Sequence, residues 1–154
     1  RVGEGAWKLI ILGDGPDKKI LLEKCRELDL SDDVIFKGLA SYDDLPVYYG
    51  LAEAFVHAST VEQWGLVANE AMASGTPVLL SKTCGCRASL LEEGINGYSF
   101  DPFSTDEIAR AMRKLHAHDA AERDAMATAS REIITQWGPE KFGNAVWSAL
   151  NACQ

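Results

Sequence analysis

The sequence predicts an α/β fold, in which a doubly wound parallel sheet carries helices on both faces. Two observations support this prediction. Short apolar runs alternate with longer stretches whose apolar residues recur at helical spacing, which is typical of parallel β-α units. Glycine or proline stands at many of the boundaries between them. With 154 residues the chain has material for one sizeable core, so we expect residues 1–154 to form one domain.

The first half of the chain predicts three β-α units in order. Residues 7–12 form an apolar run that stops at a glycine-rich turn, which indicates a buried strand. Helical spacing of apolar residues follows over 18–28. A second strand is expected over 34–36, with a short helix over 42–51. A third strand is expected over 54–56.

The second half begins with a loop at residues 62–65, which leads into a helix that stops at Gly75. An apolar run then predicts a fourth strand over 77–80, and a short helix is expected over 87–93. A fifth, short strand fits residues 97–100. Three further helices are expected over residues 104–116, 120–136 and 139–150, the first of them after the capping sequence that starts at Ser104.

Charge and hydropathy exclude several classes of protein. A formal net charge of -8 argues against nucleic-acid binding. No apolar run approaches the roughly 20 residues of a membrane span. The chain begins with Arg1 and shows no signal-peptide pattern, so we expect an excerpt of a longer, cytoplasmic protein. Peripheral membrane association of that longer protein stays open.

The cysteines do not have the spacing of a metal site. There is no CxxC pair, and no second Cys or His cluster follows Cys84-Gly85-Cys86. We therefore expect reduced thiols and no metal site. The four cysteines are Cys25, Cys84, Cys86 and Cys153.

The residues from Glu62 to Glu70 carry the most chemical information. Sheets of this kind bind ligands at the carboxyl ends of their strands. If the helix begins near Gly65, the free N–H groups of residues 65–67 face any diphosphate placed at that end. Glu62 then lies in the loop and Glu70 about one turn inside the helix. Each carboxylate can accept hydrogen bonds from two neighbouring hydroxyls, which suits a hexose and a ribose.

The same run resembles the E-x7-E motif of glycosyltransferase family 4 (group 1), whose members are retaining enzymes of the GT-B fold. The resemblance continues through residues 70–78 and covers most of the chain. It implies that residues 1–154 are the Rossmann-like C-terminal lobe, which binds a nucleotide-diphospho-sugar. Further matching segments are residues 9–16, 34–38 and 94–102.

The resemblance also implies roles for individual residues. Glu62 contacts the donor sugar as the catalytic residue, and Glu70 holds the ribose. The amides of Gly65, Leu66 and Val67 meet sugar hydroxyls and the diphosphate. Family members need neither a metal nor another cofactor.

The resemblance places two further turns around the donor. The turn at Lys37, Gly38 and Leu39 reads the base through its backbone. Gly13 and Gly15 line the phosphate side. His57 is interpreted as a peripheral donor-site residue.

Two departures from the family pattern affect these expectations. Gln63-Trp64 replaces the commoner Gly-Phe, as in a subset that also carries Cys-Gly-Cys. The family's phosphate-neutralising Arg and Lys, and the acceptor domain, would lie upstream of Arg1. We therefore expect this chain alone to be inactive.

Alternative interpretations stay open at several residues. Gly13 and Gly15 fit a plain strand-to-helix turn equally well, and His57 fits a structural histidine. Glu70 could be a helix-surface carboxylate. Trp64 is either a wall of the donor pocket or a core anchor. For the whole chain, a non-catalytic nucleotide-binding or regulatory module is the alternative, and the incomplete glycine pattern disfavours an NAD-dependent oxidoreductase.

Overall fold

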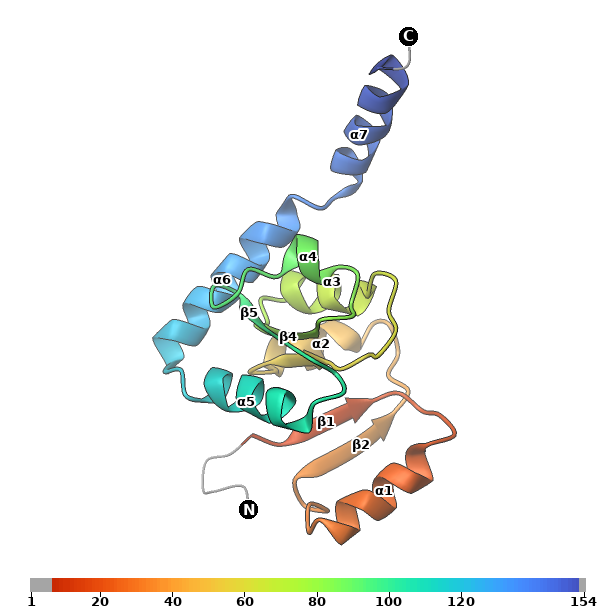
Figure 1. Cartoon of the computed structure of the whole chain (residues 1–154), viewed down its shortest axis with the longest axis vertical. Coiled ribbons are helices and arrows are strands. Elements are labelled where there is room, and N and C mark those ends of the chain that lie inside the picture. The colour runs from red at the N-terminus through yellow and green to blue at the C-terminus, as the bar shows by residue number, and fades with distance from the viewer. Residues whose placement is uncertain (1–6, 153–154) are drawn as a thin grey trace. The chain divides into compact units, whose positions relative to one another are not determined.

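The computed structural model describes residues 7–152. Its contacts divide the chain into two compact units, residues 1–45 and residues 46–154. Figure 1 shows the first unit in red to orange at the N-terminal end of the chain and the helices of the second unit through to blue. No helix among the described residues is long and apolar enough to cross a membrane.

The first unit is one β-α-β repeat, made of β1 (Leu9–Leu12), α1 (Lys18–Glu27) and β2 (Val34–Gly38). The strands are parallel, with Leu9 opposite Val34. The N–H of Gly13 donates to the carbonyl of Gly38 at 2.8 Å. The turns that follow the two strands are therefore joined directly, as expected for the carboxyl edge of a parallel sheet.

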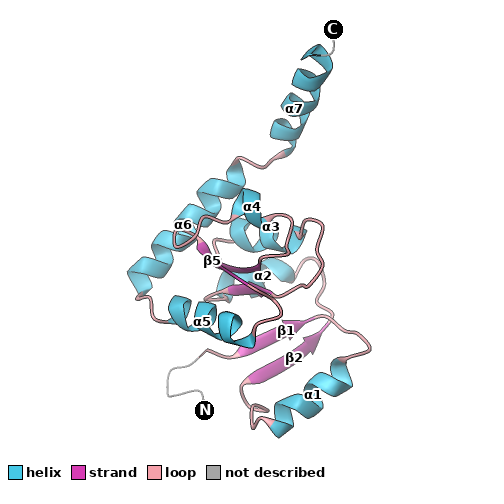
Figure 2. Cartoon of the chain, viewed as in Figure 1, coloured by secondary structure: helices cyan, strands magenta, loops and turns pink. Residues whose placement is uncertain are grey.

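The sheet of the second unit has three parallel strands in the order β3-β4-β5. Figure 2 colours the strands magenta and the helices cyan. All four residues of the central strand are buried, which explains their unbroken apolar run. The strands are β3 (Phe55–His57), β4 (Val78–Ser81) and β5 (Gly97–Phe100). The helices are α2 (Leu45–Leu51), α3 (Leu66–Ala73), α4 (Arg87–Leu90), α5 (Thr105–His116), α6 (Ala120–Thr135) and α7 (Pro139–Ala152).

The core of this unit lies between the sheet and its helices. α3 packs on β3 and β4 and against α6, while α5 packs against β5. Met72, Leu79 and Phe100 are among the largest fully buried side chains. Burying one such side chain contributes about 1.5–3 kcal/mol, so the core fixes α3 firmly on the sheet.

Local signals explain where several helices begin and end. Ser104 caps α5 by accepting from the N–H of Glu107, as its sequence predicts. Asp119 and Glu122 form a reciprocal capping box at the start of α6. Gly75 follows α3 with a φ of 77°, a backbone conformation that favours glycine.

The α/β class, the parallel pairing and the alternation of strands and helices are confirmed. Most boundaries lie close to the predicted ones. β3 extends through His57, so this residue ends the strand instead of following it. α2 begins at Leu45 and not at Tyr42, because Ser41 and Asp44 form a hydrogen-bonded turn first.

The larger difference between prediction and structure is how the strands are grouped into sheets. The described strands pair as a two-stranded and a three-stranded sheet, where the sequence predicts one doubly wound sheet. Strand pairing depends on contacts between distant segments, which apolar periodicity does not report. That residues 1–154 form a single domain stays a prediction.

Candidate functional site

α3 begins at Gly65, which has φ 96° and ψ 65°. This left-handed conformation favours glycine, because it brings a Cβ too close to the backbone. A Cβ at this position would also lie 3.0 Å from Sγ of Cys84, 3.3 Å from Cγ of Glu62 and 3.5 Å from Nε2 of His57. The structure thus brings three side chains around the start of the helix, and glycine is needed there for two reasons.

The first turn of α3 offers backbone donors. The N–H groups of Leu66 and Val67 donate to no acceptor among residues 7–152. Free N–H groups at a helix start carry partial positive charge and bind anions. Leu66 is 68% exposed, so this end of α3 is open to a ligand.

Glu62 and His57 form a pair beside this helix start. Nε2 of His57 lies 3.4 Å from Oε2 of Glu62, and both side chains are partly buried. The same Nε2 atom is buried without a hydrogen-bond partner among the described residues. The sequence offered no carboxylate partner for His57, because the two residues meet only once β3 and the loop after it are folded. The pair becomes an ion pair when the imidazole is protonated.

The loop that carries Glu62 is fixed against the segment after β4. The N–H of Gly85 donates to the carbonyl of Glu62 at 3.1 Å, and the N–H of Cys86 donates to that of Trp64 at 3.0 Å. A Cβ on Gly85 would lie 1.8 Å from the carbonyl oxygen of Gln63. The Gln63-Trp64 segment and the Cys84-Gly85-Cys86 segment therefore pack directly against each other.

The cysteines of this contact are structural. The thiol of Cys84 donates to the carbonyl of Trp64 at 3.1 Å. Burial, and next the hydrogen-bonding contact with Cys84, raises the pKa of the Cys86 thiol to about 12, so it stays protonated. The three cysteines that the structure describes, Cys25, Cys84 and Cys86, are free thiols, and Cys153 lies outside the described residues.

Trp64 packs as an anchor. Its Nε1–H donates to Oδ1 of Asn69 at 2.9 Å. Its ring lies 5.6 Å from the ring of Trp137. These contacts hold the loop to α3 and to the segment that follows α6, which favours the core-anchor interpretation over the pocket wall.

Glu70 lies in the second turn of α3, four residues after Leu66 and therefore on the same helix face. Its Oε2 accepts a hydrogen bond from the hydroxyl of Tyr49 at 3.0 Å. Burial, followed by the hydrogen bond to Glu70, raises the pKa of Tyr49 to about 12. Sequence reasoning missed Tyr49, because no local pattern links a residue of α2 to a carboxylate on α3.

The remaining predicted site residues lie in the first unit. Gly13 has φ 128° and Gly38 has φ 75°, so both turns use conformations that favour glycine. Asp14 accepts from the N–H of Gly15 at 2.9 Å, which fits a closed strand-to-helix turn. The side chains of Lys37 and Leu39 are exposed. The roles of these five residues in donor binding stay predictions.

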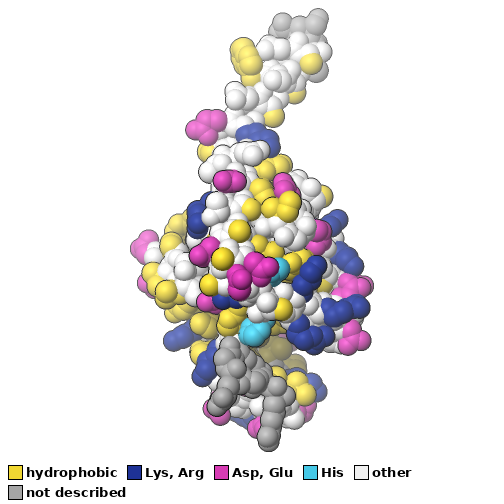
Figure 3. Space-filling view, turned by 90° about the vertical axis from the view of Figure 1, so that its left-hand side faces the viewer, with side chains coloured by type: hydrophobic (Ala, Val, Ile, Leu, Met, Phe, Trp, Pro, Cys, Tyr) yellow, Lys and Arg dark blue, Asp and Glu magenta, His cyan; other side chains and the backbone are white. Residues whose placement is uncertain are grey.

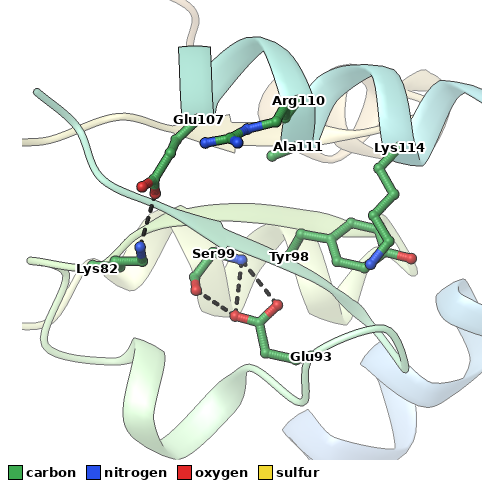
Figure 4. Close-up of a pocket in the computed structure, with 8 residues that line it drawn as sticks. All are labelled: Lys82, Glu93, Tyr98, Ser99, Glu107, Arg110, Ala111 and Lys114. Carbon is green, nitrogen blue, oxygen red and sulfur yellow. Dashed lines mark hydrogen bonds and ion pairs between the residues drawn. The ribbon is translucent and has the colours of Figure 1, made fainter. Parts of the chain in front are cut away.

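A separate pocket of about 320 Å³ lies over β5 and α5 and shares no residue with the predicted donor site. Figure 4 shows that several of its charged side chains have partners within the pocket. Lys82 pairs with Glu107 at 2.8 Å, Glu93 accepts from the N–H of Ser99, and Lys114 lies over the ring of Tyr98. We assign no ligand to this pocket.

The described residues hold no metal-binding cluster, and their surface charges are mixed on the face shown in Figure 3. Residues 7–152 contain no group of three or more His, Cys, Asp and Glu side chains that could hold a metal. Figure 3 shows acidic and basic side chains interspersed on one face. The polar groups described at the start of α3 are the backbone amides of Leu66 and Val67, the carboxylates of Glu62 and Glu70, and the imidazole of His57.

Comparison with known proteins identifies the family. Residues 4–133 match the family described as "Glycosyl transferases group 1". The chain belongs to this family. The expected resemblance to this family is thus confirmed over residues 4–133.

The chain is similar in sequence to several named glycosyltransferases. It is 30% identical to the sulfoquinovosyl transferase SQD2 of Arabidopsis thaliana over 91% of this chain and 29% of that protein. It is 30% identical to a GDP-mannose-dependent alpha-mannosyltransferase of Corynebacterium glutamicum over 96% and 32%. The chain therefore spans about a third of the length of these relatives.

Solved structures of glycosyltransferases share its fold. HepE of Anabaena in complex with UDP superposes with a TM-score of 0.82 at 25% identity, over 95% of this chain and 41% of that one. The C-terminal domain of a group 1 glycosyl transferase from Francisella tularensis gives a TM-score of 0.75 at 29% identity, over 86% and 70%. The Rossmann-like, GT-B type of fold is confirmed.

Proposed function

We propose that this chain is the donor-binding lobe of a retaining glycosyltransferase, which transfers a glycosyl group from a nucleotide-diphospho-sugar to an acceptor. The observation that carries this proposal is the start of α3, where free amides lie between two carboxylates. Glu62 precedes the helix in a fixed loop, and Glu70 lies in its second turn.

The amides of Gly65, Leu66 and Val67 are assigned to the diphosphate and the adjoining sugar hydroxyls. Oriented N–H groups and the helix dipole bind a phosphate without a cationic side chain. This local field explains how a chain with a net charge of -8 binds an anion.

The two glutamates are assigned to different parts of the donor. Glu62, next to His57, contacts the sugar as the catalytic residue, and His57 lines the edge of the site. Glu70 holds the ribose, since its Oε1 atom and the outer lone pair of Oε2 remain for two neighbouring hydroxyls. The turn at residues 37–39 is assigned to the base and the turn at residues 13–15 to the phosphate side.

The named structures support the class of donor. HepE has been solved with UDP and with UDP-glucose, so a similar fold holds a nucleoside diphosphate sugar. We propose binding without a metal or another cofactor, because helix-start amides supply the positive field. Base, sugar and acceptor are left open.

The proposed enzyme needs more chain than these residues. Relatives such as the Corynebacterium mannosyltransferase are about three times longer. We assign acceptor binding and the basic groups that stabilise the departing diphosphate to a preceding domain. The free thiols of Cys25, Cys84 and Cys86 fit a reducing compartment, which supports a cytoplasmic enzyme.

Replacement of Glu70 tests the proposal. Glu70→Ala should weaken the binding of a nucleoside diphosphate by about 1–3 kcal/mol, because two ribose hydroxyls lose a charged acceptor. Isothermal titration with UDP, GDP and ADP measures the change. Glu132→Ala, which removes an exposed carboxylate from α6, is the control and should have no effect. An unchanged dissociation constant in Glu70→Ala would remove this residue from the site.

A further inference from the structure

We infer that Tyr49 is the positioning residue that fixes Glu70 for the ribose of the donor, and that it thereby sets the preference for ribonucleotides over 2′-deoxyribonucleotides. The inference rests on the proposed function, since it needs Glu70 to be the ribose ligand. It adds a residue from α2 to a site otherwise built on β3, α3 and the loop between them.

Tyr49 reaches Glu70 across 21 residues of sequence. Its hydroxyl donates to Oε2 of Glu70 at 3.0 Å, and its side chain is only 7% exposed. Among residues 7–152 it is the one hydrogen-bond donor to that carboxylate. A glutamate side chain on a helix has several rotamers, and this bond selects one of them.

The tyrosine is itself held from two directions. Its ring packs edge-on against Phe55 of β3, with the ring centres 5.7 Å apart and the planes at 76°. The buried hydroxyl of Thr76 donates to the carbonyl of Tyr49 at 2.7 Å. Because both the ring and the backbone are fixed, the hydroxyl is a stationary donor and not a mobile surface group.

The chemistry of this pair leaves Glu70 ready for the ligand. A phenol whose pKa is raised to about 12 remains a donor at any physiological pH, so Glu70 keeps this partner. A carboxylate accepts about four hydrogen bonds, and Tyr49 uses one. The rest can accept the two neighbouring hydroxyls of a ribose, whereas a 2′-deoxyribose offers only one.

Fixing the carboxylate before binding removes an ordering cost from the complex. Immobilising one flexible side chain costs about 0.5–1.5 kcal/mol, which corresponds to roughly twofold to tenfold in affinity. Without the hydrogen bond from Tyr49, the carboxylate of Glu70 can also rotate and bind only one of the two ribose hydroxyls. Loss of the Tyr49 hydroxyl should therefore reduce both the affinity and the discrimination between the two sugars.

Tyr49→Phe tests this inference with UDP, GDP and ADP and their 2′-deoxy counterparts as the six probes in titration calorimetry. The wild-type chain should bind the best ribonucleotide roughly tenfold more tightly than its 2′-deoxy form. In Tyr49→Phe the ribonucleotide affinity should fall roughly threefold to tenfold, and the ratio between the two sugars should shrink to about threefold. The variant should fold, because the ring contact with Phe55 is kept and Glu70 is partly exposed to water.

Tyr98→Phe is the matched control. Tyr98 is similarly buried at 5% exposure, and its hydroxyl has a hydrogen bond with His118 at 2.7 Å. A general loss of stability would appear in both variants. Only Tyr49→Phe should change the ratio of ribonucleotide to 2′-deoxyribonucleotide affinity.

A double variant separates failure of this inference from failure of the proposed function. In a Glu70→Ala background, Tyr49→Phe should cause no further change in the ratio, because its effect passes through Glu70. If Glu70→Ala weakens binding while Tyr49→Phe leaves affinity and ratio unchanged, the inference is overturned and the proposed role of Glu70 survives. If Glu70→Ala has no effect, or none of the six probes binds, the proposed function fails first.

Discussion

Gly65 is the residue on which the start of α3 depends most directly. Its positive φ and the closeness of Cys84, Glu62 and His57 leave no room for a side chain. The sequence motif predicts a glycine here for close approach to a ligand. The structure adds that three protein side chains already surround the position.

Gly65→Ala should lower the free energy of unfolding by about 1–3 kcal/mol, because alanine is strained at this φ and its Cβ crowds Cys84. Urea unfolding measures the change. Gly50→Ala is the control, since no atom lies within 4 Å of a Cβ at that helical position, and it should be neutral or stabilise by up to about 1 kcal/mol. Equal effects of the two substitutions would contradict the structural reason.

Some residues of the candidate site could be predicted from the sequence, and others could not. Glu62 and Glu70 could be singled out from their spacing and their place beside a helix start. The contact of His57 with Glu62 and that of Tyr49 with Glu70 could not, because each depends on packing between separate elements.

The loop at residues 62–65 is held in place by its contact with the segment at residues 84–86. Two backbone hydrogen bonds and a thiol join them. Gly85 lies against the carbonyl of Gln63, so the Cys-Gly-Cys sequence serves to hold the Gln-Trp loop.

Gly85→Ala should displace this loop, since its Cβ would lie 1.8 Å from a backbone oxygen that cannot easily move. Overpacking of this kind costs about 1–3 kcal/mol of stability, which chemical denaturation measures. Gly143→Ala in α7 is the control, because a Cβ there meets nothing within 4 Å. A stable Gly85→Ala variant would show that the two segments are not tightly joined.

At the scale of the whole molecule, the chain is a family member that spans about a third of its relatives. The chain divides into two units, residues 1–45 and residues 46–154. The first holds the turns after β1 and β2, and the second holds the start of α3.

Nucleoside diphosphate binding should not depend on a metal. The amides at the start of α3 supply the positive field here, and basic side chains of a preceding domain would supply the rest. Titrations with UDP, GDP and ADP in the presence of EDTA and in the presence of added Mg²⁺ should give the same dissociation constants. A large loss of affinity on chelation would indicate a metal-assisted class of enzyme.

Residues 1–154 should bind nucleotide weakly and transfer no sugar. The proposed preceding domain orients the acceptor and stabilises the leaving diphosphate, and together these effects account for many orders of magnitude in rate. Release of nucleoside diphosphate in the presence of a matched acceptor measures transfer. In the full-length protein, Glu62→Ala should impair turnover more than nucleoside diphosphate binding, because Glu62 is assigned to the sugar. Sugar transfer by residues 1–154 alone would place the catalytic machinery within this chain.

The sequence by itself determined the α/β class, the order of the elements and the two glutamates beside a helix start. These features are local: they follow from apolar periodicity, from glycine at turns and from spacing within one helix. A run such as residues 77–80 indicates a buried strand wherever its neighbours lie.

Only the tertiary structure decided which strands pair, that the Cys-Gly-Cys segment holds the Gln-Trp loop, and that His57 and Tyr49 reach the two glutamates. Each of these contacts joins side chains or backbone groups from different elements. Their geometry depends on how the helices pack on the sheet, and no periodicity along one segment reports such packing. The side chains that contact the two glutamates can therefore be identified only in the folded chain.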